Sequence, residues 1–150
     1  MAKFGLLGKD IGYSFSQTFF SIKFESEQLP HTYHNFDIPS LKNFDAFIKE
    51  HPDVKGLNVT IPYKEAIIPK LFNLDKESKK IGAVNTIKFR KDGKLIGFNT
   101  DHYGFATALA KFLPIKEKTA LVLGTGGASK AILYVLDAMA FNYKIVSRTA

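Results

Sequence analysis

The chain has 150 residues, a formal net charge of +7 and 45% hydrophobic residues, which suits one globular domain or a small domain with part of a second. It contains no cysteine, so disulfides are excluded, and its apolar runs are shorter than the ~20 residues that a membrane-spanning helix needs. No N-terminal signal pattern is recognisable either, so we expect a cytoplasmic protein. The basic residues are scattered and no nucleic-acid-binding motif is recognisable, so we expect it to bind a small molecule rather than nucleic acid or a membrane.

Strand and helix patterns alternate over the first part of the chain. Strand patterns occupy 3–8, 32–38 and 55–61, and helix patterns occupy 16–29 and 40–51. Ser16 and Ser40 stand where helix caps are expected, and the second helix should end before Pro52. This β-α-β-α-β order predicts an α/β fold with a mainly parallel sheet covered by helices.

The middle of the chain changes pattern. We expect short helices after Pro62 and around 75–82, then a hairpin over 84–100 that turns at Asp92–Gly93. An amphipathic helix over 101–113 should end before Pro114.

A second β-α-β unit follows, with strand patterns at 119–124 and 143–149 and a helix pattern at 126–139. We therefore expect three parts: a domain over 1–100, a linking helix over 101–117 and the start of a second domain over 118–150. One β-α-β unit cannot cover both faces of its sheet, so we expect the chain to be the N-terminal piece of a longer protein.

The segment "LGTGGASKA" follows an apolar strand and opens a helix. Gly124 and Gly126 match the first two glycines of G-x-G-x-x-G, and Ser129 takes the third position. Gly124 permits a tight turn, Gly126 lets the backbone approach a pyrophosphate, and the helix N-terminus offers free N–H groups to an anion. The alternative is a glycine-rich turn without a ligand.

The end of the next strand bears on the choice of cofactor. An NAD site usually has an acid there to hold the ribose 2′-hydroxyl, but the sequence has Ser147, Arg148 and Thr149. The Arg148 guanidinium could pair with a 2′-phosphate, helped by the two hydroxyls, so this segment favours NADP over NAD. The alternative is a solvated arginine at a strand end.

Polar side chains gather where the predicted strands end. Ser14, Ser16, Thr60 and Lys64 follow the first and third strands, and the segments "GAVNT" and "GFNTD" add more. Ligands of parallel sheets bind beyond the carboxyl ends of the strands, and a polyhydroxylated ligand needs many donors and acceptors. Lys64 and Asp101 form the one ionisable pair of this set. Each residue also has a plainer interpretation, as a helix cap, a turn residue or a surface lysine.

Taken together, "NVTIPYK", "GAVNTI", "GFNTDHYGF" and "LGTGGASKA" resemble the shikimate dehydrogenase family in order and spacing. The resemblance runs from Gly5 to Thr149, with "SRT" where that family usually has Asn-Arg-Thr. It implies a three-layer α/β substrate domain with a mainly parallel sheet, followed by the first β-α-β unit of a Rossmann NADP domain. It also implies NADP-dependent, reversible reduction of 3-dehydroshikimate to shikimate in aromatic amino acid biosynthesis.

The resemblance assigns roles to individual residues. Lys64 and Asp101 match the catalytic pair. The implied substrate-binding residues are Ser14, Ser16, Asn58, Thr60, Asn85 and Thr100. The implied cofactor-binding residues are Gly124, Thr125, Gly126, Gly127, Ala128, Ser147, Arg148 and Thr149. No metal is expected.

Some positions depart from the family pattern. Gln17, Phe19 and Phe20 replace a proline and a His-Asn pair, and His102 stands where a small residue is common. Further substrate contacts are implied beyond Ala150, so we expect the 150-residue chain alone to be inactive and to self-associate or form a homodimer. Two alternatives stay open: a relative that also acts on quinate, and a non-catalytic ligand-binding homologue.

Overall fold

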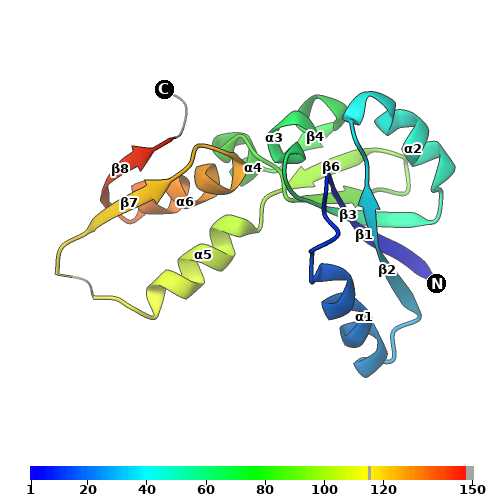
Figure 1. The fold of residues 1–150 in the computed structure, drawn as a ribbon, viewed down its shortest axis with the longest axis horizontal. Helices are drawn as coiled ribbons and strands as arrows, with labels where there is room; N and C mark the ends of the chain where they lie inside the picture. The colour runs from blue at the N-terminus through cyan, green and yellow to red at the C-terminus, as the bar shows by residue number, and fades with distance from the viewer. Residues whose placement is uncertain (115, 148–150) are drawn as a thin grey trace.

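The computed structural model describes residues 1–114 and 116–147, which form a six-stranded sheet and a two-stranded sheet (Figure 1). The elements of the larger part are β1 (Ala2–Gly8), α1 (Ser16–Ser26), β2 (His31–Asp37), η1 (Leu41–Asn43), α2 (Phe44–Glu50), β3 (Val54–Val59), α3 (Tyr63–Ala66), η2 (Ile68–Lys70), β4 (Asn73–Leu74), α4 (Lys76–Ile81), β5 (Thr86–Phe89) and β6 (Leu95–Phe98). The elements that follow are α5 (Asp101–Ala110), β7 (Thr119–Leu123), α6 (Gly127–Ala138) and β8 (Asn142–Val146).

The larger sheet has the strand order β2-β1-β3-β5-β6-β4. β1 pairs in parallel with β2 and β3, and β4 pairs in parallel with β6, whereas β5 runs antiparallel between β3 and β6. The predicted α/β class with a mainly parallel sheet is confirmed. Because β5 is reversed, its first residues lie at the same edge of the sheet as the last residues of β3 and β6. The polar residues Lys64, Asn85 and Asp101 lie together at that edge.

Hydrophobic side chains cover both faces of this sheet, because successive strand residues point to opposite faces. On one face Leu7 and Leu57 pack with Phe44 from α2 in the largest buried cluster. On the other face Leu6 and Tyr33 pack against α1 through Phe20 and Phe24. In Figure 1, α1 and α2 accordingly lie on opposite sides of the sheet.

The first helix differs from its prediction at both ends. The expected Ser16 cap is wrong: the residue before the first turn is Phe15, which makes no capping hydrogen bond, and Ser16 is already helical. The helix ends at Ser26 rather than at residue 29, because Gln28 adopts a left-handed conformation with φ of 53°. The Ser40 cap is confirmed, since its hydroxyl accepts from Lys42 N at 3.1 Å at the start of η1.

The second part forms the predicted β-α-β unit, with β7 and β8 parallel and α6 packed against them. Helix α5 lies between the two sheets in chain order and packs beside α6 (Figure 1). Leu121, Leu123, Ile145 and Val146 of this small sheet are exposed to solvent. Among the described residues, no helix is long and apolar enough to cross a membrane.

Candidate active site

Lys64 and Asp101 form an ion pair at the edge where β3 and β6 end. Lys64 follows β3 in the first turn of α3, and Asp101 opens α5 three residues after the end of β6. The Lys64 Nζ donates to Asp101 Oδ2 at 2.6 Å, and the two side chains are 15% and 33% exposed. Because the pair is partly buried, salt screens it less than it screens a surface pair, and the Asp101 side chain remains partly exposed to solvent. It is therefore open to a ligand.

Asn85 holds the second carboxylate oxygen of Asp101. This residue is buried just before β5, and its Nδ2 donates to Asp101 Oδ1 at 2.8 Å and to Thr100 Oγ1 at 2.8 Å. Its Oδ1 accepts from the Thr100 backbone N at 2.9 Å. The backbone donor and the carboxylate acceptor together fix which way the Asn85 amide faces. Both oxygens of Asp101 are thus held by named donors.

The plainer interpretation of Thr100 and Asp101 as helix caps is not what the structure contains. Thr100 makes no side-chain capping hydrogen bond. The buried Asn99 side chain takes that role, since its Oδ1 accepts from the backbone N atoms of Asp101 and His102 at 3.0 and 3.4 Å. Its Nδ2 donates to Ala83 O at 3.0 Å. Asn99 therefore orients the first turn of α5 and leaves the Asp101 carboxylate available.

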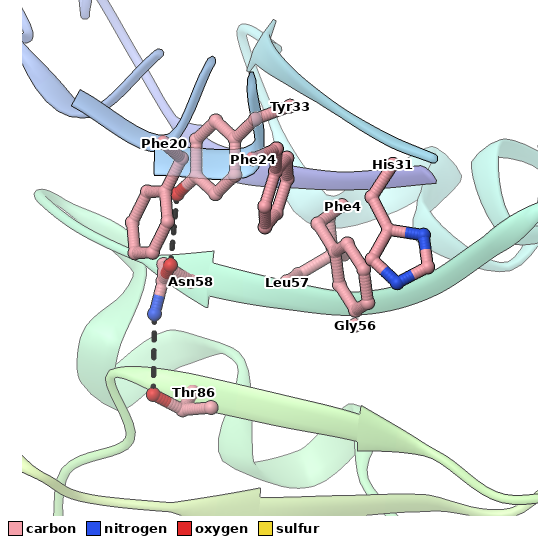
Figure 2. A pocket seen from close by; sticks show the side chains of 10 residues that line it. Phe4, Phe20, Phe24, His31, Tyr33, Gly56, Leu57, Asn58 and Thr86 are labelled. Carbon is pink, nitrogen blue, oxygen red and sulfur yellow. Dashed lines mark hydrogen bonds between the residues drawn. The ribbon is translucent and has the colours of Figure 1, made fainter. Parts of the chain in front are cut away.

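Asn58 and Thr86 are cross-strand partners on β3 and β5, on the same sheet face as α1. Asn58 Nδ2 donates to Thr86 Oγ1 at 3.3 Å, and the Tyr33 hydroxyl donates to Asn58 Oδ1 at 2.8 Å (Figure 2). Asn58 and Thr86 line a cavity of about 270 Å³ together with Phe4, Phe20 and Phe24, and Figure 2 shows how these side chains lie. Thr86 Oγ1 donates onward to Asn85 Oδ1 at 3.0 Å, which connects this face to Asp101.

The remaining expected substrate residues lie around the ends of β1 and β3. Thr60 follows β3, and its backbone N donates to Leu7 O at 2.9 Å. Ser14 Oγ accepts from the Ser16 backbone N at 3.2 Å and bonds the Ser16 hydroxyl at 3.2 Å. Within the described residues, no hydrogen bond joins these two serines to Lys64 or Asp101. Hydrogen bonds therefore join Lys64, Asp101, Asn85 and Thr100 into one cluster, and among the described residues none of those bonds includes the serine pair.

The glycine loop joins β7 to α6. Gly124 has φ of 103°, a conformation that glycine adopts without strain, and its N donates to Val146 O at 2.7 Å. Gly126 precedes the helix without a side-chain cap, and a Cβ added there would meet no atom within 4 Å. The first N–H groups of the twelve-residue helix α6 are thus left uncapped beside open space. That arrangement suits an anion.

The start of α6 also contacts the Lys64 side of the site. A Cβ added to Gly127 would lie 2.7 Å from Lys64 Cβ, closer than real atoms approach. One turn further, Lys130 on α6 forms an ion pair with Glu65 on α3. No local pattern in the sequence indicates either contact, because both join segments that are far apart in the chain.

A model of the shikimate dehydrogenase substrate binding domain matches residues 6–87. The chain belongs to the shikimate dehydrogenase family. The shikimate dehydrogenase (NADP(+)) of Aquifex aeolicus is 42% identical over 137 residues, which are 89% of this chain and 50% of that protein. The corresponding enzyme of Clostridium beijerinckii is 39% identical over 152 residues, 99% of this chain and 56% of that protein.

Solved structures of shikimate dehydrogenases have the same fold. The Thermus thermophilus enzyme in complex with NADP(H) and shikimate superposes with a TM-score of 0.85 at 36% identity, covering 99% of this chain and 57% of that one. The Peptoclostridium difficile enzyme superposes with a TM-score of 0.85 at 38% identity, covering 98% and 56%. The chain therefore spans about half the length of the shikimate dehydrogenases it matches.

The segment expected to bind the 2′-phosphate, residues 147–149, is only partly described. Ser147 is exposed directly after β8. Arg148 and Thr149 lie outside the described residues.

Asn99, Thr86 and Tyr33 were not among the expected site residues. The segments "GFNTD" and "GAVNT" contain the first two, but nothing local marked Tyr33, whose partner Asn58 is 25 positions away.

Proposed function

We propose that the protein carrying this chain catalyses the NADP-dependent, reversible reduction of 3-dehydroshikimate to shikimate. The observation that supports this most is the Lys64–Asp101 ion pair at the strand ends, with the glycine-loop helix packed against Lys64. Relatives that match nearly the whole chain are named shikimate dehydrogenase (NADP(+)). A pair of this kind beside a dinucleotide loop suits a reaction that moves a hydride and a proton together.

The residues of the glycine loop fit a dinucleotide phosphate. The proposed cofactor-binding residues are Gly124, Thr125, Gly126, Gly127, Ala128, Ser147, Arg148 and Thr149. The uncapped start of α6 supplies N–H donors, and the open space at Gly126 lets a phosphate approach the backbone. When bound, NADP supplies the hydride chemistry. Arg148 is proposed to pair with the 2′-phosphate.

The proposed substrate residues surround the ion pair. They are Ser14, Ser16, Asn58, Thr60, Asn85 and Thr100. Their hydroxyl and amide groups are the donors and acceptors that a polyol needs. Ser14 and Ser16 are assigned to the substrate carboxylate, to which their two adjacent hydroxyls can donate.

Lys64 and Asp101 are assigned the proton transfer. In the reducing direction the Lys64 ammonium donates a proton to the oxygen that becomes the hydroxyl, and in the oxidising direction the amine takes it back. Asp101 holds Lys64 Nζ in place, and Asn85 holds the other oxygen of that carboxylate. The carboxylate is thereby kept in one orientation while the proton moves.

We further propose the division of the chain into a substrate domain over 1–100, a linking helix over 101–117 and the start of the NADP domain over 118–150. The chain spans about half the length of the relatives it matches, so we expect it to lack part of the structure that positions the two reactants. Such positioning is worth about 7–11 kcal/mol of the barrier, and the 150-residue chain alone should therefore be inactive. The exposed Leu121, Leu123, Ile145 and Val146 support self-association of the isolated chain. A cytoplasmic location is proposed from the absence of cysteine.

The test uses the complete gene product that carries this chain. NADP+ reduction is followed by absorbance with shikimate, with quinate and with NAD+ in place of NADP+. We expect turnover with shikimate and NADP+, a smaller rate with quinate, and loss of turnover in Asp101→Asn. Shikimate binding without turnover in the unsubstituted protein would instead establish the non-catalytic homologue.

A further inference from the structure

A line of hydrogen bonds runs from the α1 face of the sheet to the ion pair. The Tyr33 hydroxyl donates to Asn58 Oδ1 at 2.8 Å, and Asn58 Nδ2 donates to Thr86 Oγ1 at 3.3 Å. Thr86 donates to Asn85 Oδ1 at 3.0 Å, and Asn85 Nδ2 donates to Asp101 Oδ1 at 2.8 Å. Every donor in this line points toward Asp101. A change of direction at one member would therefore disturb its neighbours.

At the far end the direction is set by the surroundings of Tyr33. The ring is 4% exposed and stacks on Phe20 with centroids 4.5 Å apart, and Phe4 and Phe24 line the same cavity (Figure 2). Burial raises the pKa of Tyr33 well above its ordinary value of 10.0, so the phenol keeps its proton at neutral pH. Its hydroxyl donates to Asn58 Oδ1, and the aromatic rings around it offer no comparable acceptor.

At the near end the direction is set by the backbone. Asn85 Oδ1 accepts from Thr100 N at 2.9 Å, so its Nδ2 must face the carboxylate. The two ends agree only if Asn58 presents its oxygen to Tyr33 and its amide nitrogen to Thr86. The proton of Thr86 is then free for Asn85. Two independent constraints thus select the same arrangement.

We propose that Tyr33 is a positioning residue for the Lys64–Asp101 pair, acting through Asn58, Thr86 and Asn85. This inference rests on the proposed function and adds a residue outside the expected site. Without the phenol proton, Asn58 loses the partner that fixes its amide, and Thr86 loses a donor of fixed direction. Asn85 still donates to Asp101 Oδ1, but its own Oδ1 then loses a Thr86 donor of fixed direction.

Tyr63 provides a matched control for Tyr33. It is also a buried tyrosine, 6% exposed, and its hydroxyl donates to Ile38 O at 2.6 Å, a backbone carbonyl outside the line. Replacing either tyrosine with phenylalanine removes one buried hydrogen bond and leaves the ring. Both Tyr33→Phe and Tyr63→Phe should lower Tm by about 2–6 °C.

The kinetic test measures kcat and KM of the complete protein with shikimate and NADP+. We expect Tyr33→Phe to lower kcat about 3- to 10-fold with little change in KM for NADP+, and Tyr63→Phe to leave kcat within about twofold. Thr86→Val should lower kcat by a similar factor, whereas Thr86→Ser should keep the kcat of the parent, since serine keeps the hydroxyl. The double variant Tyr33→Phe/Thr86→Val should lose no more than the stronger single variant. Equal kcat in Tyr33→Phe and Tyr63→Phe would overturn the proposal.

A second readout does not depend on turnover. The side-chain NH₂ resonances of Asn85, assigned by their loss in Asn85→Ser, should shift in Tyr33→Phe and Thr86→Val but not in Tyr63→Phe. If the unsubstituted protein fails to oxidise shikimate while these shifts occur, the proposed reaction falls and the positioning of Asp101 by Tyr33 stands. Unshifted Asn85 resonances in Tyr33→Phe would overturn the positioning role whatever the protein catalyses.

Discussion

Gly127 and Lys64 lie in direct contact, although they follow strands of different sheets and are far apart in the chain. A Cβ on Gly127 would lie 2.7 Å from Lys64 Cβ, which is the rigid base of that side chain rather than its flexible end. The start of the glycine-loop helix and the lysine paired with Asp101 are therefore packed as one unit. The proposed phosphate site therefore lies next to the ionisable pair.

Replacing Gly127 with alanine should impair turnover through this contact. The added methyl must displace either Lys64 or the start of α6, and a misplacement of about 1 Å can cost up to ~10²-fold in rate. We expect kcat/KM for shikimate to fall at least about tenfold. Gly104→Ala is the control, since a Cβ on Gly104 meets nothing within 4 Å and lies inside α5. It should raise the free energy of unfolding by about 0.5–1 kcal/mol without loss of activity.

Lys64→Ala should lower kcat by ~10² or more if Lys64 carries the general acid–base step. Substrate binding, measured by titration calorimetry, should weaken less. The control is Lys70→Ala, which removes the exposed Lys70–Asp45 ion pair of 3.1 Å. Such pairs contribute about 0–1 kcal/mol, so its activity and stability should stay close to the parent. Turnover of Lys64→Ala within about threefold of the parent would remove Lys64 from the mechanism.

Arg148→Ala should weaken NADP binding far more than NAD binding, because only NADP carries the 2′-phosphate. Dissociation constants for both cofactors, measured by fluorescence quenching on the complete protein, test this. Lys144→Ala, on the strand before it, serves as the charge-matched control. Equal losses for the two cofactors in Arg148→Ala would contradict the assignment.

The fold should lose stability at alkaline pH through its buried tyrosines. Burial raises the pKa of Tyr33. The pKa of Tyr63 is also raised, mainly by burial and to a smaller extent by the negative charges of Asp37 and Asp10. A pKa raised in the folded state contributes stability that is complete below the unfolded value near 10 and is lost as the pH rises above it. The free energy of unfolding, measured by urea denaturation between about pH 9 and 11, should fall less steeply in Tyr33→Phe than in the parent. Parallel pH profiles would show that Tyr33 ionises equally in both states.

Local patterns were enough to predict most of the elements. Alternating apolar residues indicated β2 and β3, helical spacing indicated α1 and α5, and Asp92–Gly93 marked the hairpin between β5 and β6. These predictions succeeded because the period of a strand or helix and the conformation of a turn are properties of neighbouring residues. The predicted Ser16 cap was wrong for an equally local reason. The Ser14 hydroxyl two residues earlier accepts from the Ser16 N, and Ser16 is already helical.

The sequence by itself also predicted which kinds of residue form the site. Polar residues that follow apolar strands can be recognised in the sequence without knowing where the strands lie. Which of them meet was decided only by the tertiary structure. Lys64 reaches Asp101 across 37 positions because β5 inserts antiparallel between β3 and β6, and strand order is set by packing between distant segments. The same packing anchors the Asn99 side chain on Ala83 O, brings Gly127 onto Lys64 and links Tyr33 to Asn58. A hydrogen bond between distant residues depends on where both side chains finally lie, and that position is fixed by the burial of the whole core.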